Sequence, residues 1–364
     1  MSTDRGARAG QEPRVRVRHD LGMAATPDEP TRVVLDSAAL EDLGRRLRTA
    51  RMTADADGTW ARGTPVGWLA ELIIDWQAFD PVALQARLDK LTHLRVQVDE
   101  VSVHVMHAAG TGTDPVPLLL THGWPSSFLE YSKLLPLLTD PAAHGGTAAD
   151  AFSVVAPSLP GFGFSGPPPA GGLTHEQVAE LWHRIMTEAL GYRRFVAHGS
   201  DLGAGVTARL ARAHPEGVAA IHLATPGLAA PPQPWSQAVR EHFDKVEQWS
   251  AEEGGYAHMH ATKPATIGAA LDDSPVALAA WIGESSPGGA ARPPTASPRS
   301  TVTCCCPRSR STGPRGPAHR PCCRTGPTAI HRRALFRPMI LRPHRPRSTS
   351  SAARSSPSPS PLAT

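Results

Sequence analysis

Short, mostly apolar runs that each end near a glycine or proline constrain the fold of this chain more than any other feature. Four of them follow one another along the middle of the sequence: 115–121, 152–157, 195–198 and 218–223. Sequences compatible with helices lie between the runs. Runs of this kind are typical of parallel strands that are buried on both faces of a sheet. The sequence therefore predicts an α/β protein with a doubly wound, mostly parallel sheet.

The residues before these runs predict a helical segment followed by a hairpin. Leu40, Leu43 and Leu47 fall on one face of a helix that begins near Asp36, and a second helical stretch carries tryptophans that we expect in the core. Between residues 94 and 107, valines alternate with other side chains, which predicts two half-buried strands. We therefore expect an N-terminal segment that wraps a larger domain.

The third run leads into the strand–turn–helix sequence Val196-Ala-His-Gly-Ser-Asp-Leu-Gly-Ala-Gly-Val-Thr207, where either Ser200 or Asp201 could be presented at the turn. In a nucleophile elbow the reactive residue has small residues two positions away on either side, because a Cβ there would clash in the strained turn. Asp201 has Gly199 and Gly203 at these positions, whereas Ser200 would have a histidine and a leucine. The spacing favours Asp201 as a nucleophile. A helix N-cap is the alternative role for this aspartate.

A second candidate site follows the first apolar run, in the sequence His-Gly-Trp-Pro that begins at His122. In this architecture an oxyanion hole forms from the backbone N–H after the nucleophile and from an N–H in an earlier strand–helix loop. We therefore expect the N–H groups of Leu202 and Trp124 to form it. Gly123 and Pro125 are also compatible with an ordinary turn. We expect His122 to be structural and not the general base.

A third candidate site lies beyond Pro226, where a proline-broken helical sequence predicts a lid over the sheet. Tyr256 is part of it, and a tyrosine above a carboxylate could hydrogen-bond an oxygen that becomes an alkoxide. His258 and His260, two residues apart, suggest a metal site. A zinc site needs at least three protein ligands, and no partner cluster is visible in the sequence. We therefore predict no metal.

Taken together, these motifs resemble the epoxide hydrolase family of the α/β-hydrolase fold, specifically its microsomal-type branch. The resemblance runs from about Val34 to Glu284. It rests on His122-Gly-Trp-Pro125, Pro160-Gly-Phe-Gly-Phe-Ser165, Gly199-Ser-Asp-Leu-Gly203 and Gly255-Tyr-Ala-His with the later Asp273-Ser-Pro. It implies hydrolysis of an epoxide to a vicinal diol through an ester on Asp201, without a cofactor. It also implies that Tyr256 is one of two lid tyrosines that activate the epoxide oxygen. Leu202 departs from the tryptophan of many members, which would alter the shape of the pocket and not the mechanism.

The charges divide the chain into an acidic body and a basic tail. From Ser285 onward there are fourteen arginines, all five cysteines and no acidic residue. Leaving those fourteen out reduces the 37 basic residues to 23 against 33 acidic ones, a net charge of −10. We therefore predict five segments. They are a disordered N-terminus (1–30), an epoxide-hydrolase-type N-terminal segment (31–110), an α/β-hydrolase core (111–225), a partial helical lid (226–284) and a disordered Arg/Pro/Ser-rich tail (285–364).

The tail is where the sequence departs from the family pattern. The family's mechanism needs a histidine base, an acid that orients it and a second lid tyrosine, all near the C-terminus. The tail offers His319, His331 and His344, but no acidic residue and no strand before them. If the bases that encode the chain from Ser285 onward are read in a shifted frame, they can encode residues that resemble the family's next lid segment. We therefore interpret the tail as the product of a frameshift near Glu284. We therefore expect impaired turnover, with the general base and its acid absent.

Other functions and partners follow from what the sequence lacks. A genuine basic tail for nucleic acid is possible in principle, but aromatic residues for base stacking are not interleaved with the arginines. A haloalkane dehalogenase shares the Asp elbow, although Leu202 stands where many of those enzymes use a tryptophan. A non-catalytic protein on this fold is a further alternative, since fold does not decide function. No bilayer-spanning stretch or secretory signal is visible, so we expect a cytoplasmic protein whose partner is a small epoxide, not nucleic acid or a membrane.

Overall fold

The computed structural model describes residues 26–27, 30–54, 57–225, 227, 231–285 and 301–303. Within these residues, eight strands form one mixed sheet in the order β1-β2-β3-β5-β4-β6-β7-β8. The strands are β1 (Thr26–Pro27), β2 (Thr92–Val98), β3 (Val101–Ala108), β4 (Val116–Thr121), β5 (Phe152–Pro157), β6 (Phe195–Ser200), β7 (Val218–Ala224) and β8 (Thr301–Thr303). The strands β5, β4, β6 and β7 are parallel, and they coincide with the four apolar runs. The predicted α/β-hydrolase fold is confirmed.

The remaining elements are mostly helices. The α-helices are α1 (Ser37–Arg48), α2 (Val66–Gln77), α3 (Pro81–Leu88), α4 (Leu135–Thr139), α5 (His175–Arg184), α6 (Leu202–Ala213), α7 (Gln237–Glu253), α8 (Gly255–Thr262), α9 (Pro264–Asp273) and α10 (Pro275–Ser285). Short helical turns are η1 (Trp60–Arg62), η2 (Phe128–Lys133), η3 (Pro141–His144), η4 (Ala148–Asp150) and η5 (Ile185–Ala189). None of the helices in the described part of the chain is long and apolar enough to cross a bilayer.

Two hydrophobic cores lie on opposite faces of the sheet, because successive strand side chains alternate between the faces. Phe195 and Ala197 of β6 belong to the core that contains Trp182 of α5 and Leu210 of α6. Val196 lies between them in sequence and packs against the other core, which includes residues of α3, η2 and α4. Both faces of the parallel strands are therefore apolar, which explains why these strands appear in the sequence as continuous runs.

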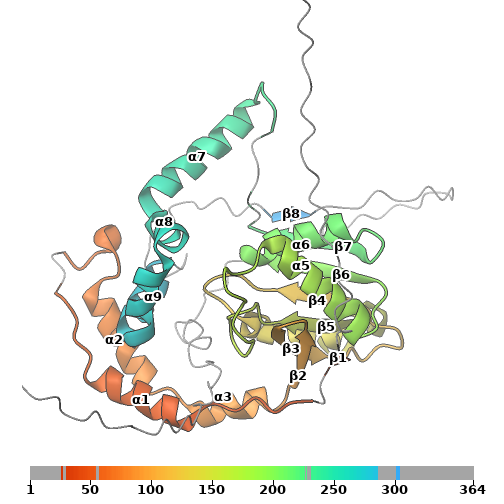
Figure 1. Ribbon diagram of the computed structural model, residues 1–364, viewed down its shortest axis with the longest axis horizontal. Helices are drawn as coiled ribbons and strands as arrows, with labels where there is room; N and C mark the ends of the chain where they lie inside the picture. The colour runs from red at the N-terminus through yellow and green to blue at the C-terminus, as the bar shows by residue number, and fades with distance from the viewer. Residues whose placement is uncertain are drawn as a thin grey trace, which may run out of the picture.

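The N-terminal helices hold the lid. The predicted helix near Asp36 is confirmed as α1, and the Asp36 side chain caps it by accepting a hydrogen bond from Ala38 N–H. Leu47 of α1 and the buried tryptophans of α2 form a third core with Val276 and Ala279 of α10. In Figure 1, α1 and α2 lie beside α9, while α7 extends away from the rest of the molecule. The position of the lid is thus tied to a segment about 200 residues earlier in the chain.

The hairpin prediction is confirmed, since β2 and β3 pair antiparallel from Thr92 and His107 to Val98 and Val101. Both segments that we expected to be disordered contain a short strand: β1 pairs with β2, and β8 pairs antiparallel with β7. The other residues of the segment 1–30 before Pro30, and those of the tail after Ser285 apart from β8, lie outside the described residues. The three tail histidines are among them.

Candidate active site

Asp201 occupies the sharp turn between β6 and α6. Its backbone has φ 53° and ψ −119°, in the left-handed half of φ space that non-glycine residues rarely adopt and that costs energy to maintain. Its backbone N–H donates to Thr225 Oγ1 at 3.1 Å and to Ala224 O at 3.3 Å, so β7 holds the turn. The strained residue is therefore Asp201, and Ser200 is the last residue of the strand before it.

Gly199, two residues before Asp201, and Gly203, two residues after it, are required by close backbone contacts. A Cβ added to Gly199 would lie 2.0 Å from Gly203 O, and one added to Gly203 would lie 2.0 Å from Thr121 O at the end of β4. Real Cβ atoms do not approach backbone oxygens so closely. The structure therefore gives a steric reason for both small residues, which the sequence indicated only by their spacing.

The loop after β4 brings a backbone donor to Asp201. Trp124 N–H donates to Asp201 Oδ1 at 2.9 Å, across 77 residues of sequence. A Cβ on Gly123 would lie 2.5 Å from both the Cβ and the Oδ1 of Asp201, so this glycine permits the approach. The following Trp124–Pro125 peptide bond is cis. Leu202 N–H, the first of α6, makes no hydrogen bond to any described residue, and the Leu202 side chain is partly exposed.

His122 is fully buried and has both ring nitrogens engaged. Its Nε2 accepts from Leu159 N–H at 3.1 Å, which requires that Nδ1 carry the proton and donate to Gly123 O at 3.0 Å. Burial lowers the pKa of His122 to about 4. The neutral ring links the loop after β5 to Gly123. It makes no hydrogen bond to Asp201.

Acid should destabilise the protein through its buried histidines. Burial lowers the pKa of His122 and of His198 to about 4, and lowers that of His104 well below its usual range. Between pH 6.5 and 4 the unfolded chain therefore binds protons that the folded chain does not, and stability falls as pH falls. His122 alone would contribute about 3 kcal/mol once the pH is well below 4. We expect urea midpoints to fall steadily from pH 7.5 to 5. The carboxyl groups whose pKa is lowered, such as Asp42 and Glu176, titrate below this window. A flat profile would contradict neutral buried rings.

The lid places Tyr256 of α8 over this loop. Its ring stacks on the Trp124 indole, with centroids 5.2 Å apart and planes at 15°. Burial raises the pKa of Tyr256, and the negative charge of Asp201 raises it further, so the hydroxyl remains protonated beside the carboxylate. Trp124 thus touches both groups: its N–H binds Asp201 and its side chain supports Tyr256.

The two lid histidines do not form a metal site. His260 lies edge-on to Trp124, and its Nε2 accepts from Trp281 Nε1 at 3.0 Å. His258 is exposed two residues earlier on α8, on a different side of the helix. No cluster of three or more potential metal ligands is present among the residues that the structure describes.

Glu130 is a site residue that the sequence did not reveal. It belongs to η2, directly after the Trp124 loop, and its Oε1 accepts from Ser200 Oγ at 3.3 Å. Burial of the carboxyl raises the pKa of Glu130, and the charge of Asp201 raises it further. No pattern in the sequence marks this glutamate, because its position next to the elbow follows from the pairing of β4 with β6.

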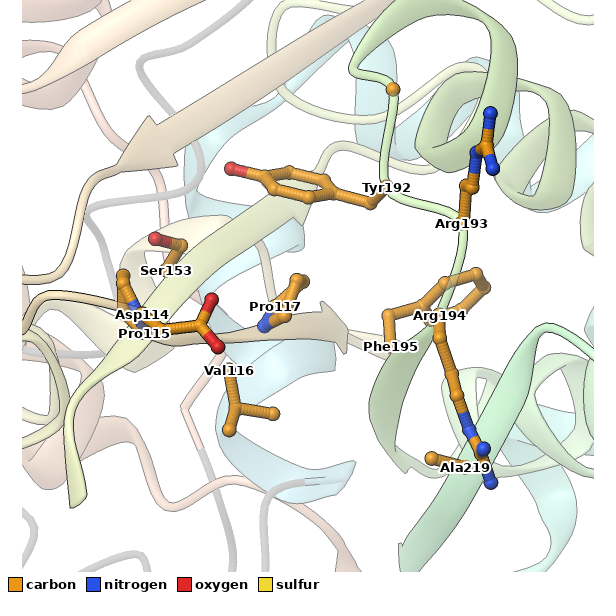
Figure 2. A pocket seen from close by; sticks show the side chains of 11 residues that line it. Asp114, Pro115, Val116, Pro117, Ser153, Tyr192, Arg193, Arg194, Phe195 and Ala219 are labelled. Atoms are coloured by element: carbon orange, nitrogen blue, oxygen red, sulfur yellow. The ribbon is translucent and has the colours of Figure 1, made fainter. Parts of the chain in front are cut away.

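A pocket of about 560 Å³ lies at the opposite end of the same strands (Figure 2). Val116 and Phe195, the first residues of β4 and β6, line it together with Asp114, Tyr192 and Arg194. In an open α/β sheet the chemistry is located at the carboxyl ends of the strands, where Asp201 is found. The pocket in Figure 2 is therefore not the candidate active site.

Comparison with known proteins agrees with this arrangement. Residues 28–131 match the family model "Epoxide hydrolase N terminus", and residues 116–253 match the model of the alpha/beta hydrolase fold. The chain is 40% identical over 260 residues to a putative epoxide hydrolase of Stigmatella aurantiaca, covering 70% of this chain and 59% of that one. It is 31% identical over 286 residues to epoxide hydrolase 1 of Oryctolagus cuniculus, covering 72% and 63%.

Solved structures give the same result. Aspergillus niger epoxide hydrolase superposes with a TM-score of 0.62 at 29% identity, covering 72% of this chain and 69% of that chain. An enantioselective mutant of that enzyme is 30% identical, with a TM-score of 0.61 and coverage of 72% and 68%. The chain spans about three fifths of the length of the curated relatives cited above.

Proposed function

The chain belongs to the epoxide hydrolase family with the microsomal-type N-terminus, and from this membership we propose that Asp201 opens epoxides by forming an ester. One observation carries the proposal: the Asp201 carboxylate lies at a strained turn and binds through Oδ1 the N–H of Trp124, whose indole stacks on the ring of Tyr256. These are a nucleophile, a donor for developing negative charge and a proton source brought together by one residue, Trp124.

The first half-reaction uses the groups in this order. One Asp201 oxygen attacks an epoxide carbon, forming a C–O bond while the ring C–O bond breaks. The ring oxygen takes the proton of Tyr256 as it becomes an alcohol. Trp124 N–H holds the other carboxylate oxygen, which becomes the carbonyl oxygen of the ester. The product of this step is an alkyl ester on Asp201 with an unprotonated Tyr256.

Removing the Tyr256 hydroxyl should slow this step. We expect Tyr256→Phe to lower the rate of ester formation by about 10²-fold or more, because the phenylalanine ring still stacks on Trp124 but supplies no proton. Single-turnover mass spectrometry measures the rate. Tyr192→Phe, at the far end of the strands, is the matched control and should leave the rate unchanged. An unaltered rate in Tyr256→Phe would assign the proton to another group.

We infer that the second half-reaction, hydrolysis of the ester, is slow in this chain. It needs a base to activate water. Within the described residues no histidine hydrogen-bonds to Asp201: the Nε2 of His122 is occupied by Leu159 N–H, and that of His260 by Trp281. A base and an acid partner supplied by the C-terminal part of the family pattern were not found in the sequence. The ester is then expected to accumulate.

The test is to incubate the full chain with a small epoxide such as styrene oxide and to follow intact mass and diol together. We expect one adduct, located on the tryptic peptide 195–209, and diol release much slower than adduct formation. Hydrolysis in ¹⁸O water should place the label on Asp201, because water attacks the ester carbonyl carbon. Diol without any adduct or ¹⁸O in the peptide would overturn the ester route, and neither adduct nor diol would favour a non-catalytic protein.

A further inference from the structure

A series of hydrogen bonds connects the loop after β5 to the Asp201 carboxylate. Its last member is the Trp124 N–H, which donates to Asp201 Oδ1 at 2.9 Å. The peptide group that carries this N–H also carries Gly123 O, and a peptide group is planar. Gly123 O accepts from His122 Nδ1 at 3.0 Å and from Ser126 N–H at 3.0 Å. The groups that hold this oxygen therefore also set the direction of the Trp124 N–H.

A second peptide group holds the His122 ring in the same way. Leu159 N–H donates to His122 Nε2 at 3.1 Å. The oxygen of that peptide group is Ser158 O, which accepts from Ser165 Oγ at 2.7 Å. Ser165 Oγ itself accepts from the N–H of His104 on β3 at 2.9 Å. The Ser165 hydroxyl is thus tied to the sheet, and its hydrogen points to the peptide group that reaches His122.

All the hydrogen bonds of this series point the same way, toward Asp201. In order, the donors are His104 N–H, Ser165 Oγ–H, Leu159 N–H, His122 Nδ1–H and Trp124 N–H. Hydrogen bonds arranged in a chain polarise one another, and they are stronger in an interior of low dielectric constant. Ser165 is 1% exposed and His122 is fully buried. The series therefore strengthens the partial positive charge that meets Asp201 Oδ1.

That charge matters most when the ester is hydrolysed. Hydroxide from the solvent adds to the ester carbonyl carbon, and the π electron pair of the carbonyl moves to Oδ1. The carbonyl then re-forms, and the alkyl oxygen leaves with the proton of the added hydroxyl, which gives the diol and the Asp201 carboxylate. During ester formation the carboxylate instead loses its negative charge. A stronger donor at Oδ1 therefore favours hydrolysis over ester formation.

We propose that Ser165 is a positioning residue for hydrolysis of the Asp201 ester and acts through His122 on the Trp124 N–H. The inference rests on the proposed function. Ser165 makes no hydrogen bond to Asp201. Its hydroxyl holds the oxygen of the peptide group whose N–H binds His122, so the ring keeps the orientation in which Nδ1–H meets Gly123 O.

The experiment compares the two half-reactions in Ser165→Ala. The full chain is loaded with styrene oxide, excess epoxide is removed, and decay of the adduct is followed by intact mass. We expect decay slower by about 10-fold, a fraction of the 10²- to 10³-fold that a whole oxyanion-hole donor contributes, and ester formation within about twofold of the parent chain. A general loosening would have the opposite effect, because water would reach the ester more easily. Decay at the parent rate or faster would overturn the assignment.

Ser153→Ala is the matched control. Ser153 is also buried, and its hydroxyl also accepts from a backbone N–H, that of Gly110 at 3.2 Å. It lies near the start of β5 and lines the pocket in Figure 2, at the opposite end of the strands from Asp201. We expect both half-reactions to proceed at the parent rate. Equally slow decay in this variant would assign the effect to any lost buried hydrogen bond and overturn the role of Ser165.

His122→Asn tests whether Ser165 acts through the imidazole ring. The shorter amide can still donate to Gly123 O from the place of Nδ1, but it leaves Leu159 N–H without this acceptor, so the series is cut. Adding Ser165→Ala to His122→Asn should then slow decay no further, since two changes in one series are not additive. Effects that multiply would show that Ser165 acts by another route and would overturn the inference.

A spectroscopic measurement tests the series in the unreacted protein. In a chain labelled with ¹⁵N-tryptophan, the Trp124 backbone amide is identified as the signal that Trp124→Phe removes. Its proton should move upfield in Ser165→Ala and stay in place in Ser153→Ala, because a less polarised N–H is better shielded. An unchanged shift in Ser165→Ala would overturn the inference. Absence of any adduct on the parent chain would overturn the proposed function, and the amide shift would still decide whether Ser165 polarises the Trp124 N–H.

Discussion

Asp201→Asn is expected to abolish the adduct entirely, with no mass increase on the peptide 195–209 after prolonged exposure to epoxide. The amide cannot act as the nucleophile that a carboxylate provides. Its oxygen can still accept from Trp124 N–H, and asparagine tolerates a positive φ better than most other non-glycine residues, so the elbow should keep its geometry. Loss of labelling would then report chemistry and not unfolding.

The matched variant for this prediction is Ser200→Ala. It changes the residue beside the nucleophile and removes the hydroxyl that donates to Glu130 Oε1. We expect it to form the adduct at close to the parent rate. Labelling of Asp201→Asn, or loss of labelling in Ser200→Ala alone, would show that the turn presents the serine and would contradict the assignment of Asp201.

The largest effect on stability is expected for Gly203→Ala. The added Cβ would lie 2.0 Å from Thr121 O and 2.8 Å from His122 O, both of them backbone atoms that cannot rotate away. Separating α6 from the end of β4 would also move Asp201 from Trp124 N–H. We expect a loss of at least about 3 kcal/mol in unfolding free energy, at the upper end of what overpacking costs. Chemical denaturation monitored by circular dichroism measures it.

Gly268→Ala is the control, and we expect it to change the free energy of unfolding in the opposite direction. Gly268 lies inside α9, and no atom is within 4 Å of the position that its Cβ would take. The same substitution there should stabilise by up to about 1 kcal/mol, because alanine favours a helix interior more than glycine does. Equal effects of the two changes would mean that the contact at Gly203 relaxes easily and is not a constraint on the elbow.

The elements of the core followed directly from the sequence. The four parallel strands lie at the four apolar runs, the hairpin lies at the alternating valines, and α1 begins next to Asp36, as predicted. Each of these patterns is local: side chains two or about four residues apart meet the same environment, so periodicity alone indicates the element. The elbow is only partly local: Gly199 is limited by Gly203 O within the same five residues, whereas Gly203 is limited by Thr121 O at the end of β4.

The sequence patterns could not predict which elements lie next to one another in space. Glu130 and Ser200 are 70 residues apart, and Trp124 and Tyr256 are more than 130 apart. Nothing in the spacing of these residues says that β4 lies between β5 and β6, which is what brings η2 and the Trp124 loop to the elbow. The lid is positioned in a similar way by α10 packing against α1 and α2.

The sequence by itself therefore determined where the central strands and the hairpin lie, and it favoured Asp201 over Ser200 at the turn through the spacing of the glycines. Only the tertiary structure decided which groups surround that residue: the Trp124 N–H on its oxygen, the tyrosine stacked above and the glutamate beside it. The physical reason is that steric and periodic constraints act along the chain. Electrostatic and hydrogen-bond partners depend on distances through space, and these are fixed only when the sheet is ordered and both of its faces are packed.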